Sequence, residues 1–405
     1  MRYRYSTLAN GKLIKKAVVY TLDEHKINFS DVDSQAVYII DRLQANGFES
    51  YIVGGAVRDL ILGKKPKDFD IVSAASPAKI KRIFRNARII GRRFRLVHVY
   101  FGPKIFEVST FRSLKDGPTS NTFGSIEEDV LRRDFSLNAL FYDPLKQIVV
   151  DYVGGMKDIK KQVIRPIIDL GSIFTDDPVR MIRAVKYSAM TGFKLPFFLK
   201  RKIKKHSQLL AGISPSRLTE EIFKIIHSPY IHEIVKSLDA LGLYAFLQCA
   251  AAERFKTEPG FKARYMDTLA SLNQGEERNN QPGIRLAALI RDYLEDEADW
   301  DGTGKDSLEQ GSPRPTLERY RNAFALARKF ILPLNPPRTE LDNALRYLFA
   351  EHGVNIKKIR LYERRPRKAA PAAPPEGTAA LSETEIPVYK RRRKKRRKTA
   401  GAPLV

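Results

Sequence analysis

The spacing of apolar residues along the chain changes near residue 175. Before that point, short apolar runs alternate with helical spacing, which is typical of strands and helices in turn. A first helical pattern starts at Asp31, where Val37, Ile40 and Leu43 recur every three residues. Residues 1–30 show little periodicity and read as a polar, basic extension. The pattern predicts strands at 51–53, 69–73, 96–101, 105–111 and 148–152, and helices at 56–62 and 77–85.

After about Thr175 the apolar spacing is helical throughout, with expected helices at 181–190, 196–205, 217–226, 232–241 and within 316–350. The stretch near 295–315 is rich in Asp, Glu, Gly, Ser and Pro, the composition of a loose insertion. We therefore expect an α+β protein of five parts. They are an N-terminal extension at 1–30, a mixed-sheet head at 31–175, a helical neck at 176–240, a helical body at 241–355 and a basic disordered tail at 356–405.

The net charge of the chain indicates what kind of partner it binds. Lys and Arg number 72 against 46 Asp and Glu, a formal net charge of +26. A surplus of this size favours a polyanion as the binding partner and says little about the fold. The tail holds much of the surplus, and residues 390–398 are nine consecutive basic residues. Such a run is ordinarily a solvated tail, but on this chain it favours salt-dependent contact with a nucleic acid backbone.

Cysteine use and hydropathy exclude other classes. The one cysteine, Cys249, allows neither an internal disulfide nor a cysteine metal cluster. No apolar run approaches the roughly 20 residues that cross a bilayer, and the start lacks the apolar stretch of a secretory signal. We expect a cytoplasmic protein without a membrane partner.

The main chemical signal is a set of three carboxylates. Side chains two apart on a strand share a face, so Asp68 and Asp70 are expected to point the same way. Close carboxylates repel each other unless a cation lies between them, and Mg²⁺ favours one or two carboxylates plus phosphate oxygens. Glu107 lies between Phe106 and Val108 on another predicted strand, so it faces away from these core residues. If Glu107 shares the surface of the aspartates, three carboxylates can hold two metal ions; a solvated strand edge is the alternative.

A glycine turn precedes these aspartates. Gly54 and Gly55 let the backbone turn tightly at the end of a strand. The helix that follows would direct free N–H groups at an anion such as a triphosphate, and Arg58 could add a bidentate phosphate contact. By itself, a glycine pair before a helix is usually only a turn.

In order along the chain, these and later segments resemble the polymerase-β-type nucleotidyltransferases. More narrowly, they resemble the bacterial group of CCA-adding enzymes and poly(A) polymerases. The resemblance covers about residues 45–230. It is carried by Gly54-Gly55 with Arg58-Asp59 and Asp68-x-Asp70, and by the segments at 132–139, 151–158, 176–184 and, more weakly, 217–221.

The resemblance implies a polymerase-β-like head and a nucleotidyltransferase activity that uses two Mg²⁺ ions, with Mn²⁺ as a possible substitute. It implies that Asp68, Asp70 and Glu107 are the metal ligands and catalytic carboxylates. The nucleotide would be held by Gly54, Gly55, Arg58, Arg133, Asp134 and Asn138, and its base would be selected by Asp177, Arg180 and Arg183.

The base-selecting segment also has a geometric signature of its own. Asp177 before Pro178 is a helix-start signal, and Asp177, Arg180 and Arg183 recur on one helical face. A surface ion pair, worth under ~1 kcal/mol, is the alternative. Where Asp176 stands the family usually has Glu, which leaves the role of Asp176 open.

The segment Gly91-Arg92-Arg93-Phe94 resembles a signature of bacterial poly(A) polymerases that CCA-adding enzymes usually lack. With the basic tail, it predicts transfer of AMP from ATP to the 3′ ends of mRNA or other transcripts, releasing pyrophosphate. CCA addition to tRNA is the alternative, and a catalytically inactive RNA-binding protein is the alternative of another class. Expected RNA contacts are the helical body, Arg92, Arg93, Lys390, Arg391, Arg392, Arg393, Lys394, Lys395, Arg396, Arg397 and Lys398.

Overall fold

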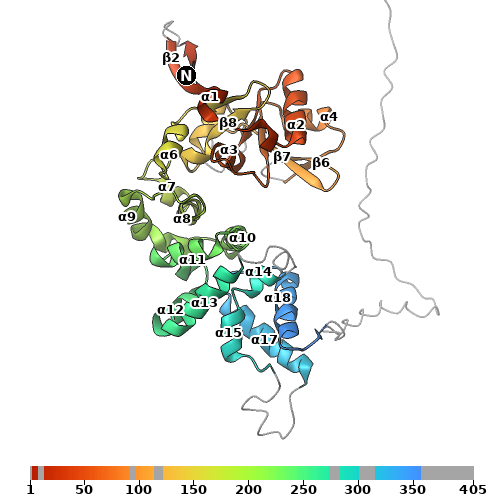
Figure 1. Cartoon of the computed structure of the whole chain (residues 1–405), viewed down its shortest axis with the longest axis vertical. Coiled ribbons are helices and arrows are strands. Elements are labelled where there is room, and N and C mark those ends of the chain that lie inside the picture. The colour runs from red at the N-terminus through yellow and green to blue at the C-terminus, as the bar shows by residue number, and fades with distance from the viewer. Residues whose placement is uncertain are drawn as a thin grey trace, which may run out of the picture. The chain divides into compact units, whose positions relative to one another are not determined.

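A mixed sheet of nine strands forms the first part of the computed structural model, which describes residues 2–7, 13–91, 96–113, 122–272, 283–300 and 315–356 (Figure 1). The strand order is β1-β2-β9-β8-β3-β4-β7-β6-β5, and β4 and β7 are parallel while the other neighbouring pairs are antiparallel. The bounds are β1 Arg2–Thr7, β2 Leu13–Tyr20, β3 Ser50–Val53, β4 Asp70–Ser73, β5 Ala87–Ile90, β6 Leu96–Phe101, β7 Lys104–Thr110, β8 Leu140–Asp143 and β9 Ile148–Asp151.

Both faces of this sheet are covered near its centre. On one face, Ile71 and Val108 are completely buried, and helix α2 packs there through Tyr38 and the ring of Phe101. On the other face, Val72 joins a core cluster that helix α5 closes with Ile126 and Val130. The helices along the sheet are α1 Leu22–His25, α2 Ser34–Ala45, α3 Gly55–Ile61, α4 Pro77–Ile83, α5 Ile126–Leu131 and α6 Gly155–Lys161.

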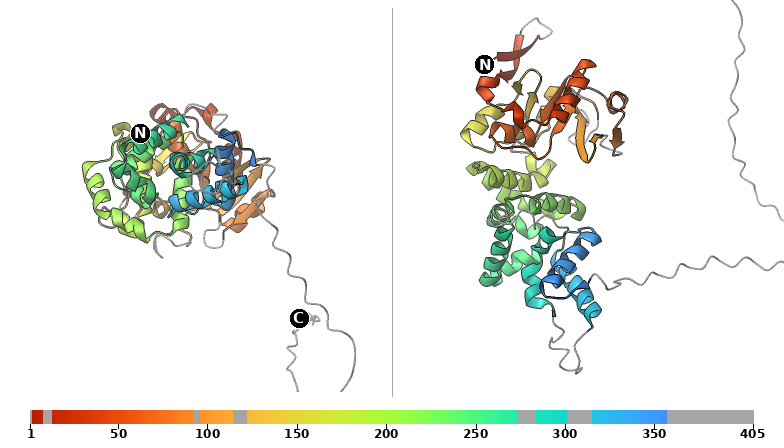
Figure 2. Two further views of the ribbon diagram at one scale, coloured as in Figure 1. Left: turned by 90° about the horizontal axis from the view of Figure 1, so that it is seen from below. Right: turned by 45° about the vertical axis from the view of Figure 1, so that its right-hand side comes forward.

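The chain beyond β9, coloured yellow to blue in Figure 2, is mainly helical and has no further named strand among the described residues. These helices follow the apolar spacing closely. In α10, for example, Leu218, Ile222 and Ile225 are buried in the spacing of one helical face. The bounds are α7 Ile173–Asp176, α8 Val179–Thr191, α9 Phe197–His206, α10 Pro215–Ile226, α11 Ile231–Ala240, α12 Cys249–Thr257, α13 Pro259–Ser271, α14 Ile284–Ala287, α15 Arg291–Glu297, α17 Thr316–Phe330 and α18 Arg338–Glu351.

The predicted α+β class is therefore confirmed, with a mixed sheet followed by helices. The pattern within 316–350 is two helices, because prolines at 333, 336 and 337 interrupt it. No helix in the described part of the chain is long and apolar enough to cross a membrane.

The N-terminal strands were not anticipated. Instead of an aperiodic lead-in, β1 and β2 form a hairpin whose second strand pairs with β9. Only the last four residues of β2 enter the interior, and its first four, including Lys15 and Lys16, are exposed. In β1, Arg2-Tyr3-Arg4-Tyr5 alternates polar and aromatic residues, which was an available strand signal, whereas the first four residues of β2 do not alternate.

Candidate active site

The parallel pairing of β4 with β7 decides where the three carboxylates lie. Ile71 is paired with Val108, and both are completely buried. Asp70 and Glu107 each stand one residue earlier, so both side chains point to the opposite face. The two carboxylates therefore share one surface of the sheet. Asp68 precedes the strand in an exposed loop, since β4 begins only at Asp70.

The electrostatics of Asp70 reflect this neighbourhood. Protein atoms surround its carboxylate although the residue keeps exposed surface, and this loss of solvent raises its pKa to about 6. The charge of Glu107 acts in the same direction, as does that of Asp68, while Arg133 partly opposes them. The carboxylates thus carry negative charge that the surrounding protein does not neutralise.

This surface suits a metal ion because of the type of its donor atoms. Its donors are carboxylate oxygens, which Mg²⁺ prefers, and a bound cation would relieve their mutual repulsion. As they stand, no three His, Cys, Asp or Glu side chains in the described ranges are grouped closely enough to hold a metal ion. Glu107 lies 3.8 Å from the His98 ring instead. The metal-ligand roles of Asp68, Asp70 and Glu107 stay predictions.

The glycine turn lies beside Asp70 because Val53, which ends β3, is paired with Asp70. Gly54 has φ +72° and ψ −136°, a backbone conformation that side chains rarely adopt. A Cβ there would sit 3.7 Å from an Asp70 carboxylate oxygen, which is ordinary contact. The conformation, and not lack of space, therefore calls for glycine.

Arg58 is turned into the protein and does not face an open phosphate site. Its guanidinium donates to both carboxylate oxygens of Asp59, at 2.8 and 3.0 Å, and to the side-chain oxygen of Asn138 at 2.9 Å. Arg58 is 4% exposed. The structure thus joins two predicted nucleotide contacts, and in this arrangement Arg58 orients Asn138.

Five of the predicted residues meet at a cavity of about 420 Å³, which we call the arginine recess. It is lined by six arginines and four aspartates, so a polyanion there would find many guanidinium donors. The lining residues are Ser109, Arg112, Asp129, Arg132, Arg133, Asp134, Asp176, Asp177, Arg180, Arg183 and Arg217. They come from β7, α5, α7, α8, α10 and the segments between them.

One carboxylate at the recess holds two of its arginines. Asp134 accepts from Nε of Arg180 at 2.8 Å and from Nη1 of Arg183 at 2.9 Å. Asp177 accepts from the Val179 backbone N–H at 3.1 Å, as the helix-start signature predicts, and its other oxygen pairs with Arg217. The alternative, a surface ion pair of Asp177 with Arg180, is not found among the described residues, and each side chain bonds to a partner remote in sequence.

Glu221 lies beneath the recess and is almost completely buried. Its carboxylate accepts from Arg183 at 2.9 Å and from Lys186 at 3.2 Å. Burial alone would raise its pKa, but Lys186, Arg183 and Lys224 outweigh burial and lower the pKa to about 2. Glu221 thereby fixes the guanidinium of Arg183 from the side opposite Asp134.

Several recess residues carried no role in the sequence analysis. Asp129 is buried and accepts from Arg133 at 2.9 Å and from the backbone N–H of Arg112 at 3.3 Å. The i,i+4 spacing of Asp129 and Arg133 was the available signal. Arg132 and Arg217 lay inside the recognised segments without a role, and Ser109 and Arg112 had no signal at all.

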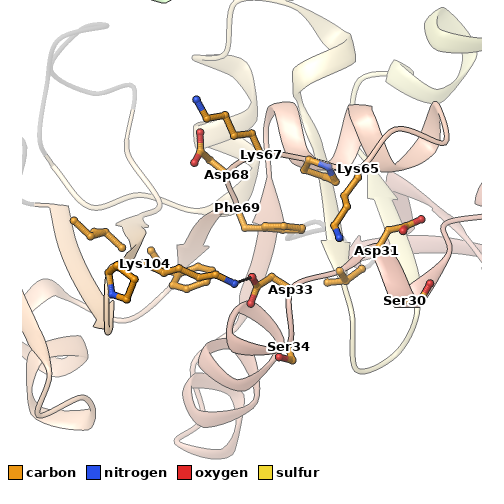
Figure 3. Close-up of a pocket in the computed structure, with 14 residues that line it drawn as sticks. Ser30, Asp31, Asp33, Ser34, Lys65, Lys67, Asp68, Phe69 and Lys104 are labelled. Carbon is orange, nitrogen blue, oxygen red and sulfur yellow. Dashed lines mark hydrogen bonds and ion pairs between the residues drawn. The ribbon is translucent and has the colours of Figure 1, made fainter. Parts of the chain in front are cut away.

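A second cavity, of about 750 Å³, borders the other side of the carboxylates (Figure 3). Asp68 stands at its edge beside Lys67, and an ion pair of Lys104 with Asp33 at 2.8 Å closes one wall. Along β7, Phe106 lines this second cavity and Ser109 lines the arginine recess. The Glu107 side chain shares the face of Ser109 and points away from the face of Phe106. The predicted RNA contacts at Arg92, Arg93 and residues 390–398 lie outside the described residues.

Comparisons with known proteins agree with this geometry. Residues 50–165 match the family model "Poly A polymerase head domain", and residues 192–253 match "Probable RNA and SrmB-binding site of polymerase A". Poly(A) polymerase I of Escherichia coli O157:H7 is 42% identical over 261 residues, 60% of this chain and 56% of that protein. The CCA-adding enzyme of Geobacillus kaustophilus is 36% identical over 225 residues, 54% of this chain and 55% of that enzyme. The chain thus spans little more than half the length of these relatives.

Among solved structures, the CCA-adding enzyme of Bacillus stearothermophilus in complex with CTP matches with a TM-score of 0.51 and 27% identity. That match covers 78% of this chain and 82% of the other. Taken with the head-domain match and the shared carboxylate face, it leads to one assignment. Residues 50–165 form a poly(A) polymerase head domain, and the chain is similar to the nucleotidyltransferases that include poly(A) polymerases and CCA-adding enzymes.

Proposed function

We propose that this chain adds AMP from ATP to the 3′ end of RNA and releases pyrophosphate, without a nucleic acid template. The observation that carries the proposal is the shared face of Asp70 and Glu107, next to the Gly54-Gly55 turn. Poly(A) polymerase relatives at 42% identity support adenylate as the transferred group. CCA-adding relatives at 36% identity keep tRNA completion as the competing activity.

The arginine recess is the proposed nucleotide site. Arg133 lies close enough to Asp70 to affect its pKa, so a triphosphate bound by the guanidinium groups would extend to the carboxylate face. Asp177, Arg180 and Arg183 would present donors and acceptors to the base. Asp134 and Glu221 keep two of these arginines in place, so selection would rest on side chains that are already oriented.

The carboxylates Asp68, Asp70 and Glu107 are the proposed holders of two divalent ions, Mg²⁺ or Mn²⁺. When bound, such ions neutralise phosphate charge and favour ionisation of the attacking 3′-hydroxyl. The chain's own contribution is to hold uncompensated carboxylates next to a cationic recess.

Helix α9, within the segment matching the RNA-binding family model, supports RNA as the partner. Phe197 and Phe198 are 71% and 72% exposed. Lys200, Arg201 and Lys204 are exposed and form no ion pair within the described residues. Exposed rings next to unpaired cations suit stacking on bases and contact with phosphates.

The test is a nucleotide-preference assay on the full chain with Mg²⁺. A generic single-stranded RNA and a tRNA lacking its 3′ end are each incubated with ATP, with CTP, or with both. We expect long extension of the generic RNA from ATP alone. Completion of the tRNA only with CTP plus ATP, and no tail on the generic RNA, would assign CCA addition instead.

A further inference from the structure

The hairpin of β1 and β2 presents aromatic rings to solvent at the edge of the sheet, outside both segments that match family models. Tyr3 and Tyr5 are 41% and 56% exposed. Their ring centroids lie 6.2 Å apart with planes at 70°. Leu13 and Ile14 on β2 are also exposed. A monomeric protein rarely leaves such a concentration of apolar surface without a use.

Cations accompany these rings. Arg2, Lys15 and Lys16 are exposed, and none of them forms an ion pair within the described part of the chain. The ammonium of Lys15 lies 3.7 Å from the centroid of the Tyr3 ring. The hairpin therefore offers rings and positive charge, while the carboxylates of Glu49 and Glu127 line the cavity beside Tyr5 and Lys16.

Arg4 has the opposite role and anchors the strand. Its guanidinium donates to Glu49 at 2.9 Å and to the hydroxyl of Tyr51 at 2.6 Å. Tyr51 is in the core, so β1 is tied to the sheet through this contact. Because Arg4 is turned inward, the exposed groups around it are held on a fixed support.

We propose that this hairpin surface binds single-stranded RNA, with bases stacked on Tyr3 and Tyr5 and phosphates near Arg2, Lys15 and Lys16. Rings combined with unpaired cations are the general means of binding single strands without sequence preference. A cavity of about 310 Å³ beside Tyr5 and Lys16 gives a stacked base room. An added protein strand fits less well, since charged edge strands oppose such pairing.

The inference deepens the proposed function and rests on it, because RNA is the substrate proposed there. A sequence-independent surface away from the carboxylates would retain many different transcripts while their 3′ ends are extended. The bound RNA would be held by its single-stranded portion, and base identity would matter little.

The test measures binding of a fluorescent 20-nucleotide single-stranded RNA to the full chain by anisotropy, without ATP. In a Tyr3→Ala/Tyr5→Ala variant we expect affinity to fall about tenfold or more, since each stacked ring is lost. Tyr3→Phe/Tyr5→Phe keeps the rings and should bind like the wild type. Tyr38→Ala, which removes an exposed ring elsewhere on the sheet's helices, is the matched control.

The charge arm uses Lys15→Gln/Lys16→Gln. Losing two phosphate contacts should make the negative slope of log affinity against log salt shallower by about 1.4. Lys160→Gln/Lys161→Gln removes the same charge from exposed positions on α6 and should change the slope much less.

Unchanged affinity in the alanine variant, or equal losses in its control, would overturn the inference. A circular dichroism melt checks that each variant is folded. If the alanine variant is unfolded, the lysine variant still tests the inference, because an unchanged salt dependence in Lys15→Gln/Lys16→Gln would overturn it. The two proposals fail separately. A wild-type chain that binds RNA through the hairpin but incorporates no AMP would remove the proposed function alone, and an active chain with unaltered variants would remove this inference alone.

Discussion

Charges are arranged in opposite ways at the carboxylate face, formed by Asp70 and Glu107, and in the arginine recess. At the face, burial and, after it, the negative charge of Glu107 raise the pKa of Asp70 to about 6. In the recess, Arg180 and Arg183 are joined to Asp134, and Arg183 also to Glu221. Side chains that satisfy one another hold a shape, whereas side chains with unmet charge call for a ligand. In the recess, Asp134 and Glu221 hold the arginines in position. At the carboxylate face, no such pairing with an arginine holds Asp70 or Glu107 among the described residues.

Removing a carboxylate from the face of Asp70 and Glu107 should have the largest effect, and it should act on the rate of AMP incorporation. We expect Asp70→Asn to lower the rate of AMP incorporation about 10³-fold, because the site would lose charge needed where phosphate chemistry occurs. RNA affinity without ATP should be unchanged. Single-turnover assays with Asp41→Asn, an exposed aspartate on α2, provide the control. Wild-type rates in Asp70→Asn would remove the catalytic role from this face.

A change at Glu221, whose charge is balanced by Arg183 and Lys186, should act mainly on the free energy of unfolding. Glu221→Gln leaves Arg183 and Lys186 buried without their counter-charge, and we expect the free energy of unfolding to fall by about 3 kcal/mol. Its neighbour Glu220 is exposed and pairs only with Lys224, so Glu220→Gln should cost under ~0.5 kcal/mol. Urea titration at pH 7 measures both, and equal losses would contradict the distinction.

The smallest expected effect is the pH dependence of that difference. The folded pKa of Glu221 is lowered to about 2 from an ordinary value near 4.5. Its stabilising effect is therefore complete above the ordinary value and is lost as the pH falls toward 2. The stability gap between the wild type and Glu221→Gln should narrow from about pH 5 downward. A gap that stays constant to the lowest pH at which both chains fold would show that the charge of Glu221 is not its source.

Strands β3, β4, β6, β7 and β9 could be predicted because each is a short apolar run, whereas the buried β8 and the strand β5 were missed. The face of Glu107 followed from the alternation of Phe106, Glu107 and Val108. The partners in the recess could not be predicted in this way. Arg180 bonds to a residue 46 positions earlier, and Asp177 to one 40 positions later. Local spacing placed Asp177 and Arg180 together, but packing between distant segments chose their partners.

The N-terminal hairpin escaped prediction for a different reason. The alternation of Arg2-Tyr3-Arg4-Tyr5 spans only four residues, and its aromatic side is the exposed one; the start of β2 does not alternate.

Asp134 has a consequence beyond its two hydrogen bonds. It follows α5 near the sheet, whereas Arg180 and Arg183 belong to helix α8. A single carboxylate thus couples the part of the chain that would carry out the chemistry to the part that would recognise the base. If these parts have the proposed roles, a substitution of Asp134 would alter both the rate of AMP transfer and the choice of nucleotide.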